Sequence, residues 1–139
     1  MAANTSPIFV LTGDFLPGRI AAANTASDGS GALVTIVTSG ANGSRVDGVR
    51  FRNAQVALAA SSAMVHRIFL SDAAGANYRL IGEIATAAAT RSATAIGATS
   101  IYTFDLPVIM KSGQIMAVCQ SVYAGVQDQF DACAFAGDY

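Results

Sequence analysis

The chain has 139 residues, the length of one ordinary domain and enough to bury a core without disulfide or metal support. Hydrophobic residues make up 53% of it but charged residues only 12%, about half of the fraction usual in soluble domains. The formal net charge is −1, and the arginines are spread along the sequence among acids. This argues against a nucleic-acid-binding protein, because such proteins cluster their cations.

So little charge is unusual for a protein that stays dissolved as a monomer. We therefore expect neighbouring subunits to cover much of the surface. The alternative is an exterior rich in Ser, Thr, Asn and Gly that stays soluble without charge.

The N-terminal region lacks the features of a signal peptide, because the first positively charged side chain is Arg19. No apolar run approaches the roughly 20 residues that a membrane-spanning helix needs. We therefore expect a chain that is made and assembled in the cytoplasm, without a membrane partner.

Apolar residues recur mostly with a period of two, and turn residues separate the runs, which predicts β-strands. A short apolar run at 8–11 and an extended piece through Arg19 and Ile20 come first. The stretch 32–38 is largely β-branched and flanked by glycines, and Asn42-Gly43 favours a tight turn after it. Further strands are expected at 49–56, 64–70, 77–84, 100–106, 115–123 and 129–136.

Two stretches are less regular. Residues 85–98 are rich in Ala, but they lack large apolar residues at helical spacing, so we expect a long loop or an irregular edge strand. In 100–106, Tyr102, Phe104 and Leu106 are expected on one face. Pro107 should end this strand or place it at the edge of a sheet.

About eight strands without βαβ alternation predict antiparallel sheets. We predict an all-β fold, an antiparallel eight-stranded β-sandwich of jelly-roll type, ahead of an immunoglobulin-like arrangement. Residues 25–139 are expected to form this single domain. Residues 1–24 are expected to form an extended N-terminal arm or an edge strand.

No grouping of residues predicts catalysis. His66 is the only histidine and falls within an expected strand, so we interpret it as a packed or edge residue rather than a base. No Ser-His-Asp or Cys-His arrangement can be argued from the sequence. We predict that the chain is not an enzyme.

The aspartates fall mostly at expected turns, where a carboxylate accepts local backbone hydrogen bonds. Asp128 and Asp131 are candidates for a glycosidase-like pair, or for a calcium site together with Asp138, but their spacing matches no calcium loop. The run Asp28-Gly29-Ser30-Gly31 precedes a strand instead of opening a helix, which excludes a phosphate-binding loop.

Cys119 and Cys133 are expected to be buried free thiols. A cross-strand disulfide would require their two segments to pair, and assembly in the cytosol disfavours it. One histidine and two cysteines do not make a zinc site. We therefore predict no metal and no cofactor.

Several stretches carry a resemblance to a known group of proteins. They are 25–35 (TASDGSGALVT), 40–51 (GANGSRVDGVRF), 67–72 (RIFLSD), 75–80 (GANYRL), 83–84 (EI) and the ending 135–139 (FAGDY). Together they resemble small virion proteins of tailed phages.

The resemblance implies a capsid decoration (cement) protein, which stabilises the shell by bridging capsomers. The partners implied are the chain's own copies, with a trimer favoured, and the major capsid protein. The location implied is the virion, assembled in the host cytoplasm. The alternative is a tail, baseplate or adhesion-module component of the virion.

Residues 1–24 precede the region of strongest resemblance and contain the strand-like run at 8–11. We expect this arm to cross to a neighbouring subunit or to lie on the shell. Its candidate interface residues are Ile8, Phe9, Val10, Leu11 and Phe15.

Overall fold

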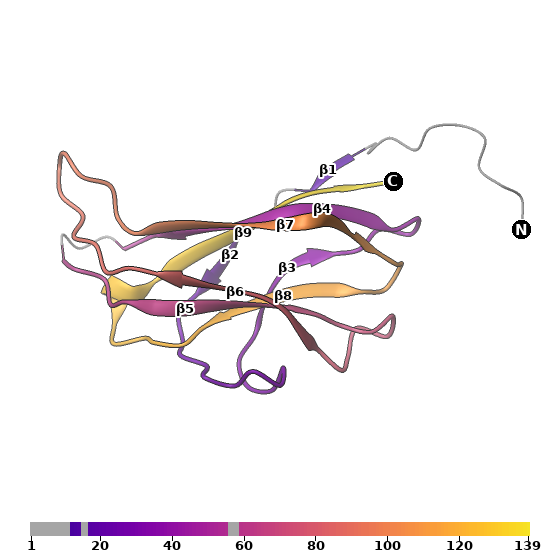
Figure 1. Cartoon of the computed structure of the whole chain (residues 1–139), viewed down its shortest axis with the longest axis horizontal. Coiled ribbons are helices and arrows are strands. Elements are labelled where there is room, and N and C mark those ends of the chain that lie inside the picture. The colour runs from indigo at the N-terminus through magenta and orange to yellow at the C-terminus, as the bar shows by residue number, and fades with distance from the viewer. Residues whose placement is uncertain (1–11, 15–16, 56–58) are drawn as a thin grey trace, which may run out of the picture.

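The computed structural model describes residues 12–14, 17–55 and 59–139. Over these residues the protein is all-β, with nine strands and one 3-10 helix, and the strands form two sheets that face each other (Figure 1). The elements are β1 (Thr12–Asp14), β2 (Gly18–Ile20), β3 (Val34–Thr38), β4 (Ser44–Asn53), β5 (Met64–Leu70), β6 (Arg79–Thr86), β7 (Thr99–Met110), β8 (Ile115–Gln120), η1 (Val126–Asp128) and β9 (Phe130–Asp138).

One sheet has five strands in the order β1-β9-β4-β7, with β2 also paired to β9. The other has four strands in the order β3-β8-β5-β6. All pairings between these strands are antiparallel. The prediction of an all-β chain with antiparallel sheets is therefore confirmed.

The pairings are nested. The pair β5–β6 lies inside β4–β7 along the chain, which lies inside β3–β8, and the pairing of β1 and β2 with β9 encloses them all. The chain is thus one long hairpin with its tip between β5 and β6. Since β1 and β2 pair one after the other with the same edge of β9, they share one strand position, and the nine strands fill eight strand positions in the two sheets. The further pairings β4–β9 and β5–β8 join alternate layers of this hairpin, which gives the two sheets.

The core lies between the sheets and follows the alternation of the sequence. In β4, Val46, Val49 and Phe51 are buried, while Arg45 and Arg52 are exposed. The facing sheet contributes residues such as Ile68, Met116 and Val118, and β9 contributes Phe130. Each such side chain contributes about 1.5–3 kcal/mol on burial.

Strand β7 departs from the expected pattern. It continues through Pro107 to Met110, and it lies at the edge of its sheet, so the edge alternative for Pro107 is confirmed. Val46 pairs with Val108 but Gly48 pairs with Thr103, so residues 104–107 of β7 bulge opposite Asp47. Leu106 therefore lies exposed on this bulge, and its expected place beside Tyr102 and Phe104 is wrong.

Residues 87–98 contain no strand, so the loop alternative holds for them. An isolated bridge joins Thr90 to Ala60. Arg91 fixes the loop, because its guanidinium donates to the backbone oxygens of Gln55 at 2.8 Å and Asn53 at 2.7 Å.

The expected N-terminal arm is only partly described. Its strands β1 and β2 pair with β9 of the same chain. The candidate interface residues Ile8, Phe9, Val10, Leu11 and Phe15 all lie outside the described residues.

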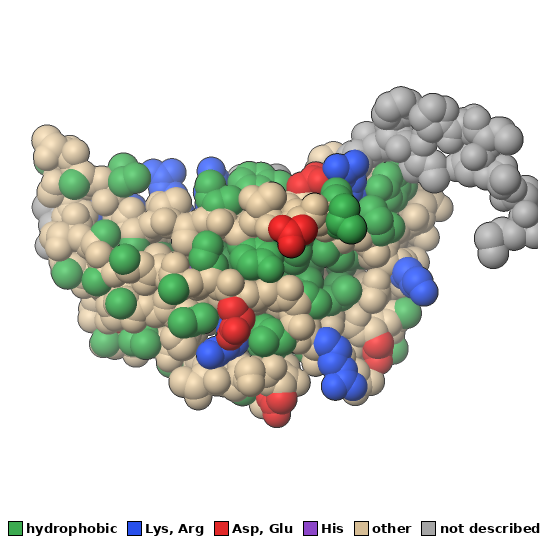
Figure 2. All heavy atoms as spheres, in the orientation of Figure 1, with side chains coloured by type: hydrophobic (Ala, Val, Ile, Leu, Met, Phe, Trp, Pro, Cys, Tyr) green, Lys and Arg blue, Asp and Glu red, His purple; other side chains and the backbone are tan. Residues whose placement is uncertain are grey.

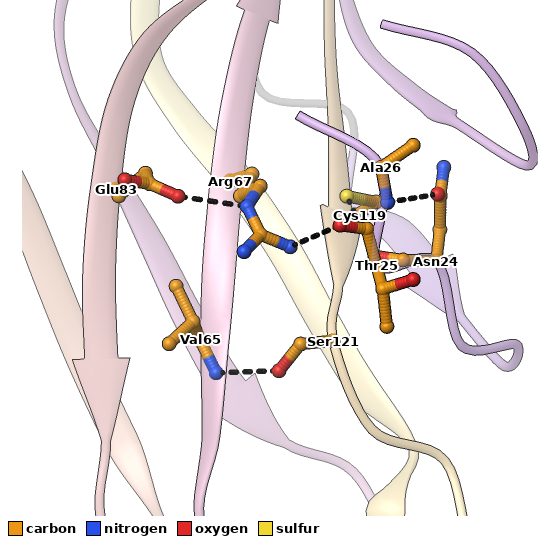
Figure 3. A network of polar contacts seen from close by, with 8 residues as sticks. All are labelled: Asn24, Thr25, Ala26, Val65, Arg67, Glu83, Cys119 and Ser121. Atoms are coloured by element: carbon orange, nitrogen blue, oxygen red, sulfur yellow. Dashed lines mark hydrogen bonds and ion pairs between the residues drawn. The ribbon is translucent and has the colours of Figure 1, made fainter. Parts of the chain in front are cut away.

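A loop of the chain itself covers the outer face of the four-stranded sheet. We call residues 21–33, which connect β2 to β3, the cover loop; in Figure 1 it passes below β5 and β8. Arg67 on β5 donates to the backbone oxygen of Thr25 at 3.3 Å and to Glu83 at 2.7 Å, as Figure 3 shows. The thiol of Cys119 on β8 donates to the backbone oxygen of Asn24 at 3.6 Å.

The cover loop leaves little of this face open. Phe69, Ala117 and Cys119 lie outside the core between the sheets, and each is nevertheless fully buried. Asn24 holds the loop in shape, because its side-chain amide donates to the backbone oxygens of Ser30 and Ala32. Within this loop, Asp28 accepts from the amide and hydroxyl of Ser30, as expected of a turn aspartate.

The bulge generates a test of the fold. A Cβ at Gly48 would lie 2.6 Å from the backbone oxygen of Tyr102, whereas a Cβ at Gly13 would meet nothing within 4 Å. We expect Gly48→Ala to lower the free energy of unfolding by about 1–3 kcal/mol, because a backbone atom must move. Gly13→Ala, the control, should change it by less than about 0.5 kcal/mol. Urea unfolding followed by circular dichroism measures both, and equal effects would contradict the role given to Gly48.

Candidate interface on the five-stranded sheet

The outer face of the five-stranded sheet bears exposed apolar side chains. Ile101 and Ile109 on β7 are 52% and 59% exposed, and Phe135 on β9 is 39% exposed. Leu106, on the bulge of β7, is 81% exposed. On the four-stranded sheet, Leu80 at 37% is the only large apolar side chain exposed among the described residues. The two sheets therefore differ in how much apolar surface they leave open.

Arginines run along the middle of the same face. Arg45, Arg50 and Arg52 occupy the outward positions of β4, because Val46, Val49 and Phe51 between them point into the core. Figure 2 shows blue and green side chains, with red ones among them, along the upper border of the molecule, which is the outer side of β4, β7 and β9 in the orientation of Figure 1.

The register sets Arg45 and Arg50 directly beside isoleucines of β7, whereas Arg52 lies between Thr99 and Asp131. Arg50 pairs with Ile101 on one side and Cys133 on the other. Gly48 lies between Thr103 and Phe135, and a Cβ on this glycine would lie 3.5 Å from the Phe135 ring. We call Arg45, Arg50, Arg52, Ile101, Ile109 and Phe135 the open face.

Two arginines around the open face have a counter-charge. Arg19 on β2 binds Asp131 at 2.9 Å, and Arg45 binds Asp47 at 2.8 Å. Hydrogen bonding to these carboxylates, followed by their charge, raises the pKa of both arginines. Both pairs are largely exposed, so they contribute little to stability.

Arg50 and Arg52 form no ion pair within the described part of the chain. Arg50 is half-buried, and its Nη2 donates only to the sulfur of Cys133, at 3.7 Å. Its Nε is buried without an acceptor among the described residues. The open face thus carries an excess of positive charge beside apolar side chains.

His66 is packed in the core, as interpreted from the sequence. Its ring stacks on Phe51 with centroids 4.3 Å apart, and it lies 4.7 Å from Phe130. Nδ1 lies 2.9 Å from the Thr86 hydroxyl, while Nε2 is buried with no partner among the described atoms. Burial lowers the pKa of His66 to about 4, so the ring is neutral at physiological pH.

The three candidate carboxylates do not share a site. Asp128 is fully buried and accepts from the Ser62 amide at 2.7 Å, the Ser62 hydroxyl at 2.9 Å and the Ala124 amide at 2.8 Å. Asp131 binds Arg19, and Asp138 accepts from the Ser44 hydroxyl. Asp128 therefore ties the segment before β5 to the connection between β8 and β9.

Both cysteines are buried free thiols, as expected. Cys119 is on β8 and Cys133 on β9, which belong to different sheets, so the pairing that a disulfide would need does not form. Burial raises the pKa of the Cys119 thiol, which keeps it protonated at neutral pH. Across the described ranges, no three His, Cys, Asp or Glu residues are grouped so as to hold a metal ion.

The open face was missed at the sequence level, although its signal is present. Apolar Ile101 and Phe135 fall on the outward side of their strands, among residues that alternation assigns to solvent. The arginines look scattered in the sequence, but the two-residue period of a strand aligns Arg50 with Arg52 on one face.

His66 generates a test of stability against pH. The pKa of His66 is near the ordinary value of 6.5 in the unfolded chain and about 4 in the folded chain. Protonation of His66 therefore favours the unfolded chain between these two pH values. We expect the free energy of unfolding to fall by about 2 kcal/mol from about pH 7.5 to pH 5 on account of His66. His66→Phe should lose this dependence in urea unfolding measured at both pH values. The same decline in both proteins would refute the assignment.

Asp128 generates a second test. Asp128→Ala removes the acceptor of two backbone amides and a hydroxyl, and we expect it to lower the free energy of unfolding by about 2 kcal/mol or more. Asp105→Ala, at an exposed carboxylate on β7, is the control and should change it by less than about 0.5 kcal/mol. Thermal or urea unfolding distinguishes the two, and a neutral Asp128→Ala would show that these hydrogen bonds do not hold the connection.

No helix in the described segments has the length and apolar character needed to cross a bilayer. Comparison with known proteins assigns no relative: no family model, no curated protein and no solved structure matches the chain.

Proposed function

We propose that the chain is a structural subunit of a phage virion, a capsid decoration (cement) protein that stabilises the shell by bridging capsomers. The observation that carries the proposal is the contrast between the two sheets. The four-stranded sheet is covered by the chain's own loop, whereas the open face leaves apolar side chains and arginines exposed. Exposed apolar surface rimmed by polar groups is typical of protein interaction sites.

The strand order supports a jelly roll, which we propose as the fold type. In a jelly roll, one long antiparallel hairpin is rolled so that its strand pairs fall alternately into two sheets. Here β4–β7 and the pairing of β1 and β2 with β9 fall in one sheet, while β5–β6 and β3–β8 fall in the other. Jelly rolls occur in viral capsid proteins but also in lectins and cupins, so the fold supports the proposal without being specific to it.

The low charge supports burial in an assembly, since only 12% of residues are charged. The stretches that resemble virion proteins include residues 25–33 of the cover loop and much of the β5–β6 hairpin. The partners we propose are the major capsid protein and the chain's own copies, with a trimer favoured. We propose no enzymatic activity, because the only histidine is buried and neutral and the candidate carboxylates are engaged separately.

Copy number tests this proposal. Quantitative mass spectrometry of purified particles of the phage that encodes the chain should find it in hundreds of copies per virion. Tens of copies or fewer would instead support the alternative, a tail or baseplate component. Absence from the particle would overturn both.

Two matched variants test the role of the open face. We expect Phe135→Ser to weaken binding to particles that lack the protein by at least about tenfold, because it removes an apolar contact from the interface. Leu80→Ser, at a residue of nearly equal exposure on the other sheet, should bind within about twofold of the wild type. Co-sedimentation measures both, and equal binding by the two variants would contradict the assignment of the interface.

A further inference from the structure

We infer that the open face receives a carboxylate-bearing surface of a different protein rather than a second copy of this chain. The inference rests on the proposed function and names the chemistry of the partner at that site. In a virion, that partner is the shell protein to which the subunit attaches.

The charges of the open face are unequally matched. Asp47 binds Arg45, and Asp131, the cross-strand neighbour of Arg52, binds Arg19, so Arg50 and Arg52 form no ion pair within the described part of the chain. Arg50 is already half-desolvated, and its Nε is buried without an acceptor among the described atoms. A cation in this state is stabilised most by an anion delivered from outside, and a carboxylate accepts from a guanidinium with matching geometry.

The apolar neighbours make this ion pairing more favourable. Ile101 lies directly across from Arg50, and Phe135 lies one pair further along the same face. When a partner covers these side chains, water leaves the surroundings of the arginines, and the effective dielectric constant falls. The partner surface that fits therefore combines apolar side chains with carboxylates.

Beyond Arg52 the face ends in a pocket of about 380 Å³, lined by Arg52, Arg91 and residues 92–96. The Arg91 guanidinium is occupied by the backbone oxygens of Asn53 and Gln55, so Arg52 is the cation available to a ligand there. This pocket provides a concave site for an acidic side chain of the partner.

A second copy fits the open face poorly. A twofold contact places the same surface on both sides, so the arginine row of one subunit would face that of the other. Like charges brought together and desolvated oppose association. A twofold contact between two open faces is therefore disfavoured, and a contact between different surfaces of two copies, as in a trimer, is tested below by light scattering.

The experiment uses the full chain and particles that lack it. Arg52→Glu reverses the charge on the open face, and Arg79→Glu makes the same change at an exposed arginine on β6 of the other sheet. We expect Arg52→Glu to weaken particle binding at least about tenfold at low salt and Arg79→Glu to change it less than about twofold. Wild-type binding should also weaken as NaCl rises from about 0.05 to 0.5 M, and this salt dependence should be shallower in Arg52→Glu.

The other outcomes separate the two proposals. If the wild type binds particles and Arg52→Glu binds equally well, this inference fails and the proposed function stands. If the wild type does not bind, both fail. A fall in the oligomer mass of Arg52→Glu in light scattering, without particles, would identify a second copy as the occupant and overturn the inference. Arg52-dependent binding of the wild type to an oligonucleotide would overturn it in favour of nucleic acid.

Discussion

The structure depends on strand β4, which is paired along its length on both sides, to β7 and to β9. Because side chains alternate across a strand, this double pairing fixes which side chains lie on each face of β4. Val46, Val49 and Phe51 lie in the core. Arg45, Arg50 and Arg52 lie on the outer face. A register slip of one residue would bury the arginines and expose the phenylalanine. The core and the open face are thus two results of one register.

Much of the fold could be predicted from local patterns. The alternation in 64–70 and 100–106 and the Asn-Gly turn after 32–38 are properties of short stretches, and the strands lie where these patterns place them. The bulge at 104–107 could not be predicted, because it depends on how many residues of β4 lie opposite β7. The positions of Cys119 and Cys133 in different sheets and the path of the cover loop likewise arise from contacts between residues far apart in the sequence.

The same limit explains what was missed at the candidate site. The interface residues predicted from the sequence lie within 8–15, outside the described residues, whereas the described surface offers Ile101, Ile109 and Phe135 beside arginines. Recognising these as one face requires knowing that β7, β4 and β9 are neighbours. His66 and Asp128 show the reverse case, because their residue types suggest chemistry, yet stacking on Phe51 and three donors around the carboxylate give them structural roles.

The nested hairpin also has a kinetic consequence. Its outermost pairing joins residues more than a hundred positions apart, such as Arg19 and Asp131, and β4 has no neighbour on one side until β9 is made. Contacts of such long range form slowly. During synthesis the half-built core around Phe51 is therefore expected to stay open until β9 leaves the ribosome. A partly folded chain with exposed apolar surface and few charges is prone to aggregation in this interval. We therefore expect the chain to depend more on chaperones the longer β9 takes to pair.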